Sequence, residues 1–152
     1  MTESKYDYLR TTEIIRETVY PPFLGMLFFA LKDKKEDFQI RFTHVSEPFE
    51  GKEDPHAHDF AQVFLFVPCT PDLKAYDAET HYSFGEEGEE MVITETCAIY
   101  VPAGLIHCPY KHVRVGTPFF FVNCPITHEY SAIVDGKQQA IPVRMDKKPD
   151  SK

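Results

Sequence analysis

The sequence has no tryptophan, only seven glycines and no long apolar segment. No apolar run approaches the roughly 20 residues that a membrane-spanning helix needs. The first residues also lack the basic start and apolar centre of a secretory signal peptide. We therefore expect a cytoplasmic protein without a membrane partner.

A surface for nucleic acid is also absent. The chain has 24 acidic and 16 basic residues, for a formal net charge of −8, and no stretch gathers Lys and Arg into a basic stripe. Nucleic-acid phosphate would on average be repelled. The acidic run at residues 86–90 is interpreted as the solvated tip of a hairpin. We expect no nucleic-acid partner.

Cysteine is present four times but never as a C-x-x-C pair. This spacing argues against a zinc ribbon or a thioredoxin-like site. The even number would allow two disulfides, but without a signal peptide we expect reduced thiols. Cys69, Cys97, Cys108 and Cys124 are then interpreted as small buried apolar residues.

The composition that is present suits one folded β-rich domain. The chain has 152 residues, of which 43% are hydrophobic and 14% aromatic. This length permits a sizeable core, and aromatic residues favour strands. We find no internal repeat, no domain boundary and no helical pattern that we would defend.

About nine short strands account for most of the sequence. Residues 38–45 alternate, with Phe38, Ile40 and Phe42 on one face and Gln39, Arg41 and Thr43 on the other, which predicts a half-buried strand. The other predicted strands are 23–31, 63–67, 75–84, 91–94, 97–101, 106–110 and 118–122, with a terminal hairpin from 133–134 and 140–143. This pattern predicts an all-β sandwich or barrel.

The two ends of the chain are assigned separately. Residues 1–22 are predicted to form a short N-terminal arm, either a helix or an arm lying on the barrel, which ends at Pro21 and Pro22. Residues 23–144 form the barrel. Residues 145–152 are charged and are predicted to be a disordered tail.

Three histidines stand where strands begin or end. His56 and His58 are two apart, so in an extended strand both imidazoles point to the same face. His107 follows a turn marked by Pro102 and Gly104. Imidazole is a ligand for zinc, copper, iron and nickel. We predict a metal site on the inner wall of the barrel.

The spacing H-x-H-x3-Q, followed by P-x-G-x2-H, resembles the two motifs of the cupin superfamily. His56, His58 and His107 match the family histidines, and Gln62 stands where the family has glutamate. The likeness covers roughly the middle half of the chain and extends to small bacterial cupins of unassigned function. It implies a double-stranded β-helix, or jelly-roll, barrel. The sequence departs from the family glycines and asparagine at Glu50, Cys69, Thr96 and Lys111.

The expected site differs from the family pattern at Gln62. Its amide oxygen is neutral and a weaker donor than a carboxylate of similar reach. We therefore expect lower affinity for a divalent ion (zinc, iron, manganese or nickel) but stronger Lewis-acid action on a bound group. The resemblance also implies that loss of the acid is compatible with an enzyme, because three-histidine cupins that use iron with oxygen exist.

His81 and Glu79 are candidates for proton transfer. They share one face of the strand predicted at 75–84, opposite the face of Ala78, Thr80 and Tyr82. If their face looks into the barrel, they are catalytic residues beside the metal. If it looks outward, they are surface residues. Three further histidines, His44, His112 and His128, are interpreted as satisfied or surface residues.

Three functions are compatible with these observations. The first is a metal-dependent enzyme acting on a small, polar, oxygen-bearing metabolite. The second is a non-catalytic cupin that binds a metal or small ligand as a sensor. The third is a degenerate, metal-free cupin. We also expect a homodimer, because the apolar runs 23–31 and 119–121 exceed what one small barrel easily buries.

Overall fold

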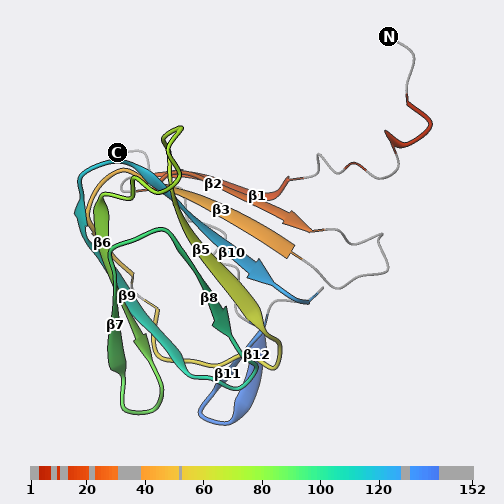
Figure 1. Ribbon diagram of the computed structural model, residues 1–152. Helices are drawn as coiled ribbons and strands as arrows, with labels where there is room; N and C mark the ends of the chain where they lie inside the picture. Colours follow the sequence, from red (N-terminus) through yellow and green to blue (C-terminus); the bar gives the residue numbers. More distant parts are fainter. Residues whose placement is uncertain are drawn as a thin grey trace, which may run out of the picture.

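The computed structural model describes residues 4–7, 10, 14–20, 23–30, 39–51, 53–127 and 131–140, and it describes side chains in all of these except 14–20, 23–30 and 138–140. Two antiparallel sheets form the two walls of the molecule (Figure 1). Within the described ranges there is no α-helix. The predicted all-β jelly-roll architecture is confirmed.

The larger sheet has six strands, in the order β1 (Ile14–Tyr20), β2 (Phe23–Ala30), β3 (Gln39–Val45), β10 (Phe119–Pro125), β5 (Gln62–Pro68) and β8 (Cys97–Val101). The smaller sheet has four, in the order β4 (Phe49–Glu50), β9 (His107–Val115), β6 (Ala78–Phe84) and β7 (Glu89–Ile93). A separate hairpin joins β11 (Ser131–Val134) to β12 (Lys137–Ala140).

The core fills the space between the two sheets. Phe64 and Phe66 of β5 and Phe119 and Phe121 of β10 point inward, where they pack against one another and against Tyr82 of the opposite sheet. The buried cluster contains Val45, Phe64, Phe66, Ala78, Tyr82, Ile93, Val101, Cys108, Phe119 and Phe121. Aromatic side chains therefore fix the separation of the sheets.

The N-terminal region contributes a strand that the sequence did not predict. Ile14–Tyr20 pairs with β2, with Tyr20 opposite Phe23. It is extended rather than helical and forms one edge of the larger sheet. The boundary between an N-terminal arm and the barrel at residue 22 stays a prediction. The predicted tail at 145–152 lies outside the described residues.

Strand β3 buries the opposite face from the one that its apolar residues indicated. Gln39, Thr43 and Val45 are buried, whereas Phe42 is 37% exposed. Phe42 packs edge-on against Phe120 of the neighbouring β10, with ring centroids 6.4 Å apart. Pairing with β10, rather than apolarity along β3 alone, decides which face lies inward.

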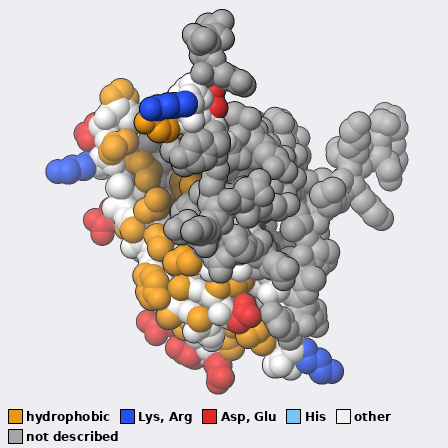
Figure 2. Space-filling model, turned by 90° about the vertical axis from the view of Figure 1, so that its right-hand side faces the viewer, with side chains coloured by type: hydrophobic (Ala, Val, Ile, Leu, Met, Phe, Trp, Pro, Cys, Tyr) orange, Lys and Arg blue, Asp and Glu red, His pale blue; other side chains and the backbone are white. Residues whose placement is uncertain are grey.

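The described surface is acidic with scattered apolar side chains. Figure 2 shows hydrophobic side chains along one part of this surface and several acidic side chains near its lower edge. Met91, Val92 and Tyr100 are the exposed large apolar residues of the edge strands β7 and β8. No helix in the described ranges has both the length and the apolar character required to cross a bilayer.

Candidate metal centre

The three predicted histidines lie together at one end of the space between the sheets. His56 and His58 precede β5, and His107 begins β9. A bridge of two backbone hydrogen bonds joins His56 to His107, with N–O distances of 3.1 and 2.9 Å. The ring centroids are 4.6 Å apart for His56–His107, 4.9 Å for His56–His58 and 5.0 Å for His58–His107.

All three rings are held through the same nitrogen. The Nδ1 atoms hydrogen-bond to backbone carbonyl oxygens: His56 to Asp54 at 2.7 Å, His58 to Ser131 at 2.5 Å and His107 to Leu105 at 3.0 Å. Because a carbonyl only accepts, each Nδ1 carries the proton, and the lone pair is on Nε2. Metal-binding histidines are oriented by outer hydrogen bonds of this kind.

Burial keeps two of these rings neutral. His58 and His107 are each 2% exposed. Desolvation lowers the pKa of His58 to about 3, although the hydrogen bond to Ser131 opposes it. Desolvation likewise lowers the pKa of His107 to about 4, against the hydrogen bond to Leu105. Neutral imidazole is the form that binds a metal, so the rings have the required protonation at neutral pH.

Gln62 lies beside the histidines, and only one of its two amide atoms has a hydrogen-bond partner. It is fully buried at the start of β5, and its Nε2 is 3.2 Å from Nε2 of His107. Its Oε1 is also buried and has no hydrogen-bond partner. A buried acceptor without a partner is costly. A cation bound by the imidazoles would satisfy this oxygen, so the donor set fits a divalent metal.

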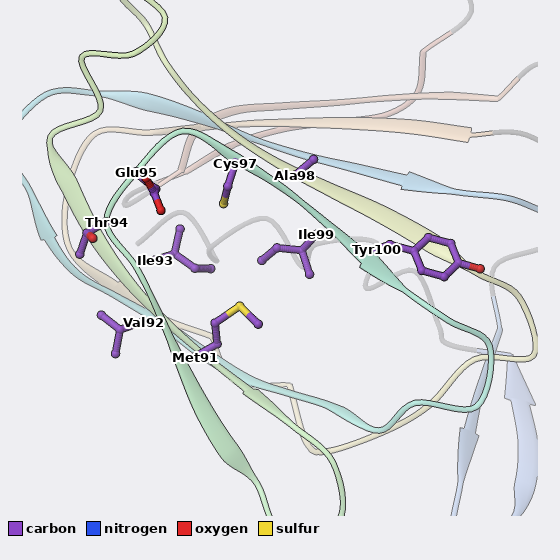
Figure 3. A pocket seen from close by; sticks show the side chains of 9 residues that line it. All are labelled: Met91, Val92, Ile93, Thr94, Glu95, Cys97, Ala98, Ile99 and Tyr100. Atoms are coloured by element: carbon purple, nitrogen blue, oxygen red, sulfur yellow. The ribbon is translucent and has the colours of Figure 1, made fainter.

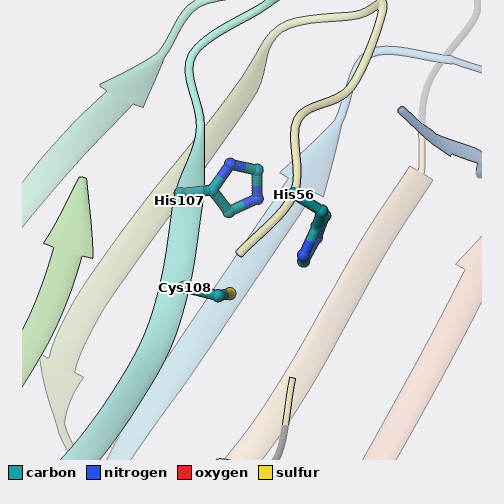
Figure 4. A group of neighbouring side chains, drawn as sticks. All are labelled: His56, His107 and Cys108. Carbon is teal, nitrogen blue, oxygen red and sulfur yellow. The ribbon is translucent and has the colours of Figure 1, made fainter. Parts of the chain in front are cut away.

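Cys108, which the sequence did not indicate as a ligand, lies beside His56 and His107. The ligand atoms of these three residues all lie within 4.8 Å of one another, and this group, which does not include His58, could hold a metal ion. Figure 4 shows the three side chains turned toward a shared space. Burial raises the pKa of the Cys108 thiol, which is therefore protonated when no ion is bound.

A β-bulge explains why His107 and Cys108 both point inward. Neighbouring residues of a regular strand face opposite sides. Here the pairing of β9 with β6 shifts, because Tyr110 lies opposite Tyr82 and His107 lies opposite Phe84. Two residues of β9 thus face one of β6, and Cys108 has a φ of 77°. Pro109, inside a predicted strand, was the available signal for a bulge.

Glu79 and His81 lie on the outer side of β6, which is the second of the two orientations that the sequence left open. Ala78, Thr80 and Tyr82 are the buried residues of this strand. His81 instead donates from Nε2 to Glu79 at 2.6 Å and from Nδ1 to Glu90 at 2.5 Å. The hydrogen bonds to Glu79 and Glu90 raise the pKa of His81. The catalytic role expected for this pair required an inward face.

The other histidines differ in their surroundings. His112 is buried, and its Nδ1 is 2.8 Å from Oγ1 of Thr80. His44 lies against Phe120 on the outer side of the larger sheet, with ring centroids 5.5 Å apart. His128 lies outside the described residues. Neither His44 nor His112 belongs to the metal-binding group.

Two surface hollows have no histidine in their lining. The larger, of about 410 Å³, runs between the edge strands β7 and β8 and is lined by Met91, Val92, Ile93, Thr94, Glu95, Cys97, Ala98, Ile99 and Tyr100 (Figure 3). The second, of about 290 Å³, shares Met91, Ile99 and Tyr100. Because no histidine lines either hollow, we do not place the chemistry there.

Comparison with known proteins gives structural likeness without close sequence likeness. No protein-family profile matches the chain, and no curated protein sequence matches it. A variant of oxalate decarboxylase from Bacillus subtilis matches with a TM-score of 0.51 and 12% identity, over 76% of this chain and 28% of that one. The capsular polysaccharide assembling protein CapF from Staphylococcus aureus matches with a TM-score of 0.53 and 11% identity, over 79% and 30%.

A cupin superfamily protein from Desulfitobacterium hafniense also matches, with a TM-score of 0.46 and 13% identity, over 72% of this chain and 84% of that one. The chain spans less than half the length of the first structures that it matches. Identities this low indicate a shared fold only. The two antiparallel sheets, together with the likeness to the oxalate decarboxylase and CapF structures, identify the chain as a protein with a jelly-roll fold.

Proposed function

We propose that this chain is a metal-binding cupin in which His56, His58 and His107 hold a divalent ion and Gln62 lies at a fourth position. We further propose that it is an enzyme acting on a small, polar, oxygen-bearing metabolite. The observation that carries the proposal is the clustering of the three imidazole rings. Each is fixed through Nδ1, and their centroids lie no more than 5.0 Å apart.

The donor set suggests what the site would do chemically. Three imidazoles and an amide oxygen are neutral, so a bound zinc, iron, manganese or nickel ion would keep its dipositive charge and polarise a carboxylate or carbonyl. The histidines would hold and orient the ion. Gln62 would contribute an oxygen without charge. Oxalate decarboxylase from Bacillus subtilis, which has a similar fold at 10% sequence identity, is described with Mn(II) centres. This likeness supports the presence of a metal but does not indicate which metal.

One observation favours the alternative of a non-catalytic cupin that binds a metal or small ligand as a sensor. The two described hollows on the surface are not lined by the histidines. Neither hollow would then lead a substrate to the histidines, and the site would bind an ion without catalysing a reaction. A degenerate, metal-free cupin is the remaining alternative. We retain the cytoplasm as the proposed location, since all four cysteines are unpaired.

Metal content and turnover separate these functions. Protein purified without an affinity tag should contain close to one divalent ion per chain, and His58→Ala should reduce that content strongly. The loaded protein should then convert a member of a panel of small hydroxy, keto and carboxylic acids, with and without oxygen. Metal without turnover across the panel would support the sensor. Absence of bound metal after incubation with each candidate ion would contradict the metal-binding proposal itself.

A further inference from the structure

We propose that Cys108 binds the same ion as a thiolate, making the centre a mixed nitrogen–sulfur site. This inference rests on the proposed metal-binding function and deepens it. A nitrogen–sulfur site favours thiophilic ions such as Zn²⁺ and Co²⁺ over Mn²⁺. Gln62, at the position of the family glutamate, is neutral. Cys108 is therefore the candidate for the negatively charged ligand of the centre.

The position of Cys108 is the first support. Its side chain is 3% exposed, and its Sγ lies within 4.8 Å of a ligand nitrogen of His56 and of His107. The bulge in β9 turns it to the same side as His107 (Figure 4). The bulge thus places a sulfur where an ion held by the histidines would lie.

The polar contacts of Cys108 are the second support. Its Sγ donates to Oε2 of Glu53 at 3.5 Å and is 3.5 Å from the hydroxyl of Tyr82. When an ion binds, the S–H bond breaks, a sulfur–metal bond forms, and the proton passes to Glu53 or to water. No electron changes hands in this step. Glu53 precedes the histidine pair and provides a carboxylate next to the departing proton.

The buried amide of Gln62 is an independent sign that a cation belongs here. Its Oε1 has no partner, although the residue is fully buried and its Nε2 is 3.2 Å from His107. Gln62 also leaves the site without the negative charge that the family glutamate would bring. A thiolate at Cys108, which follows His107 in β9, would restore one negative charge. The negative charge that is missing at Gln62 would thus be supplied by the thiolate of Cys108.

Co²⁺ provides a direct test, because a thiolate ligand gives a near-ultraviolet charge-transfer band that nitrogen and oxygen ligands do not. Titration of chelator-treated wild-type protein with Co²⁺ should produce this band together with visible d–d bands. Cys108→Ser should bind Co²⁺ at least tenfold more weakly and lose the charge-transfer band while keeping the d–d bands. Cys97→Ser, which alters a half-buried cysteine in β8, should match the wild type.

Competition gives a second readout. The wild type should prefer Zn²⁺ over Mn²⁺, and Cys108→Ser should reduce that preference at least tenfold. Wild-type protein that binds Co²⁺ with d–d bands and no charge-transfer band would overturn the role of Cys108 while leaving the histidine site intact. Wild-type protein that binds none of Co²⁺, Zn²⁺, Fe²⁺, Mn²⁺ and Ni²⁺ would instead overturn the proposed function. The two failures are therefore distinguishable, and both are read from the wild type without reliance on the folding of a variant.

Discussion

Gln62 offers a test of the site by a change of one side-chain atom. Gln62→Glu replaces an amide nitrogen with a carboxylate oxygen and adds one negative charge beside His107. We expect the affinity for a divalent ion to rise by roughly tenfold or more, which corresponds to about 1.4 kcal/mol. Calorimetric titration of one metal into the wild type and the variant measures this change.

Turnover of the same variant should move in the opposite direction. A site that uses the positive charge of the ion to polarise its substrate should become slower when a carboxylate joins the ion. An affinity that Gln62→Glu leaves unchanged, while His58→Ala removes binding, would show that position 62 does not face the ion. The ligands of the proposed site would then be the histidines and Cys108, without Gln62.

His112 predicts a pH dependence of stability. Burial lowers its pKa to about 4, from an ordinary value of 6.5. Between these values the unfolded chain binds more protons than the folded chain, so the free energy of unfolding falls as the pH drops from 6.5 toward 4. At about 1.4 kcal/mol per pH unit, the loss from this group is on the order of 2–3 kcal/mol.

Urea unfolding of the metal-free protein at pH 7.5 and 4.5 checks this prediction. Other groups titrate in the same range, so the informative quantity is the difference between the wild type and His112→Gln. The variant should lose less stability on acidification than the wild type, because it lacks a buried imidazole that must stay neutral. Equal losses in both proteins would show that His112 is protonated in the fold at no cost.

At the scale of the strand, β6 separates a buried face from a solvent-facing face. His81, Glu79 and Glu90 form an ion-pair network on the outer side, next to Lys111 of β9. We expect His81→Gln and Glu79→Gln to leave metal affinity and turnover unchanged. A tenfold decrease in either quantity for His81→Gln would mean that this face reaches the centre, contrary to the burial pattern of the strand.

Alternation in the sequence predicts which residues share a face, but not which face lies inward. For β6 the two groups of residues were assigned correctly, and the structure then selected the face of Thr80 and Tyr82. For β3 the apolar residues indicated the wrong face, because Phe42 lies on the outer side of the sheet, where it packs edge-on against Phe120. Facing is decided by pairing with neighbouring strands, which are distant in sequence.

The candidate site could be predicted only in part for the same reason. The spacing of His56, His58 and His107 was visible along the chain, and the structure places their rings together. Cys108 could not be placed by alternation, because a bulge reverses its direction. The carbonyl of Ser131, which holds His58, comes from a hairpin 73 residues away and has no signature in the sequence.

At the scale of the whole molecule, we predict a homodimer formed through the outer side of the larger sheet. Of the apolar run 119–121, Phe119 and Phe121 are buried in the core and only Phe120 faces out, so this run exposes less apolar surface than the sequence predicted. Phe120 and Phe42 are 38% and 37% exposed and contact each other across β3 and β10. A second copy would cover this pair.

Light scattering over a range of concentrations checks the assembly. The wild type should have twice the chain mass of 17.6 kDa, and Phe120→Lys should shift it toward the monomer. Val113→Lys is the matched control, since Val113 is 44% exposed on the smaller sheet and should leave the dimer intact. A wild-type mass of one chain at every concentration would contradict the prediction.

The central claim is that His56, His58 and His107 form one metal centre, and a titration of metal-free protein tests it most directly. Zn²⁺ added to the wild type should bind at one ion per chain. His58→Ala and His107→Ala should each weaken binding at least a hundredfold, as expected from the loss of an imidazole ligand. His44→Ala, a histidine on the outer side of β3, should bind like the wild type. Binding that survives His58→Ala and His107→Ala unchanged, or no binding to the wild type by any of zinc, iron, manganese and nickel, would contradict the account.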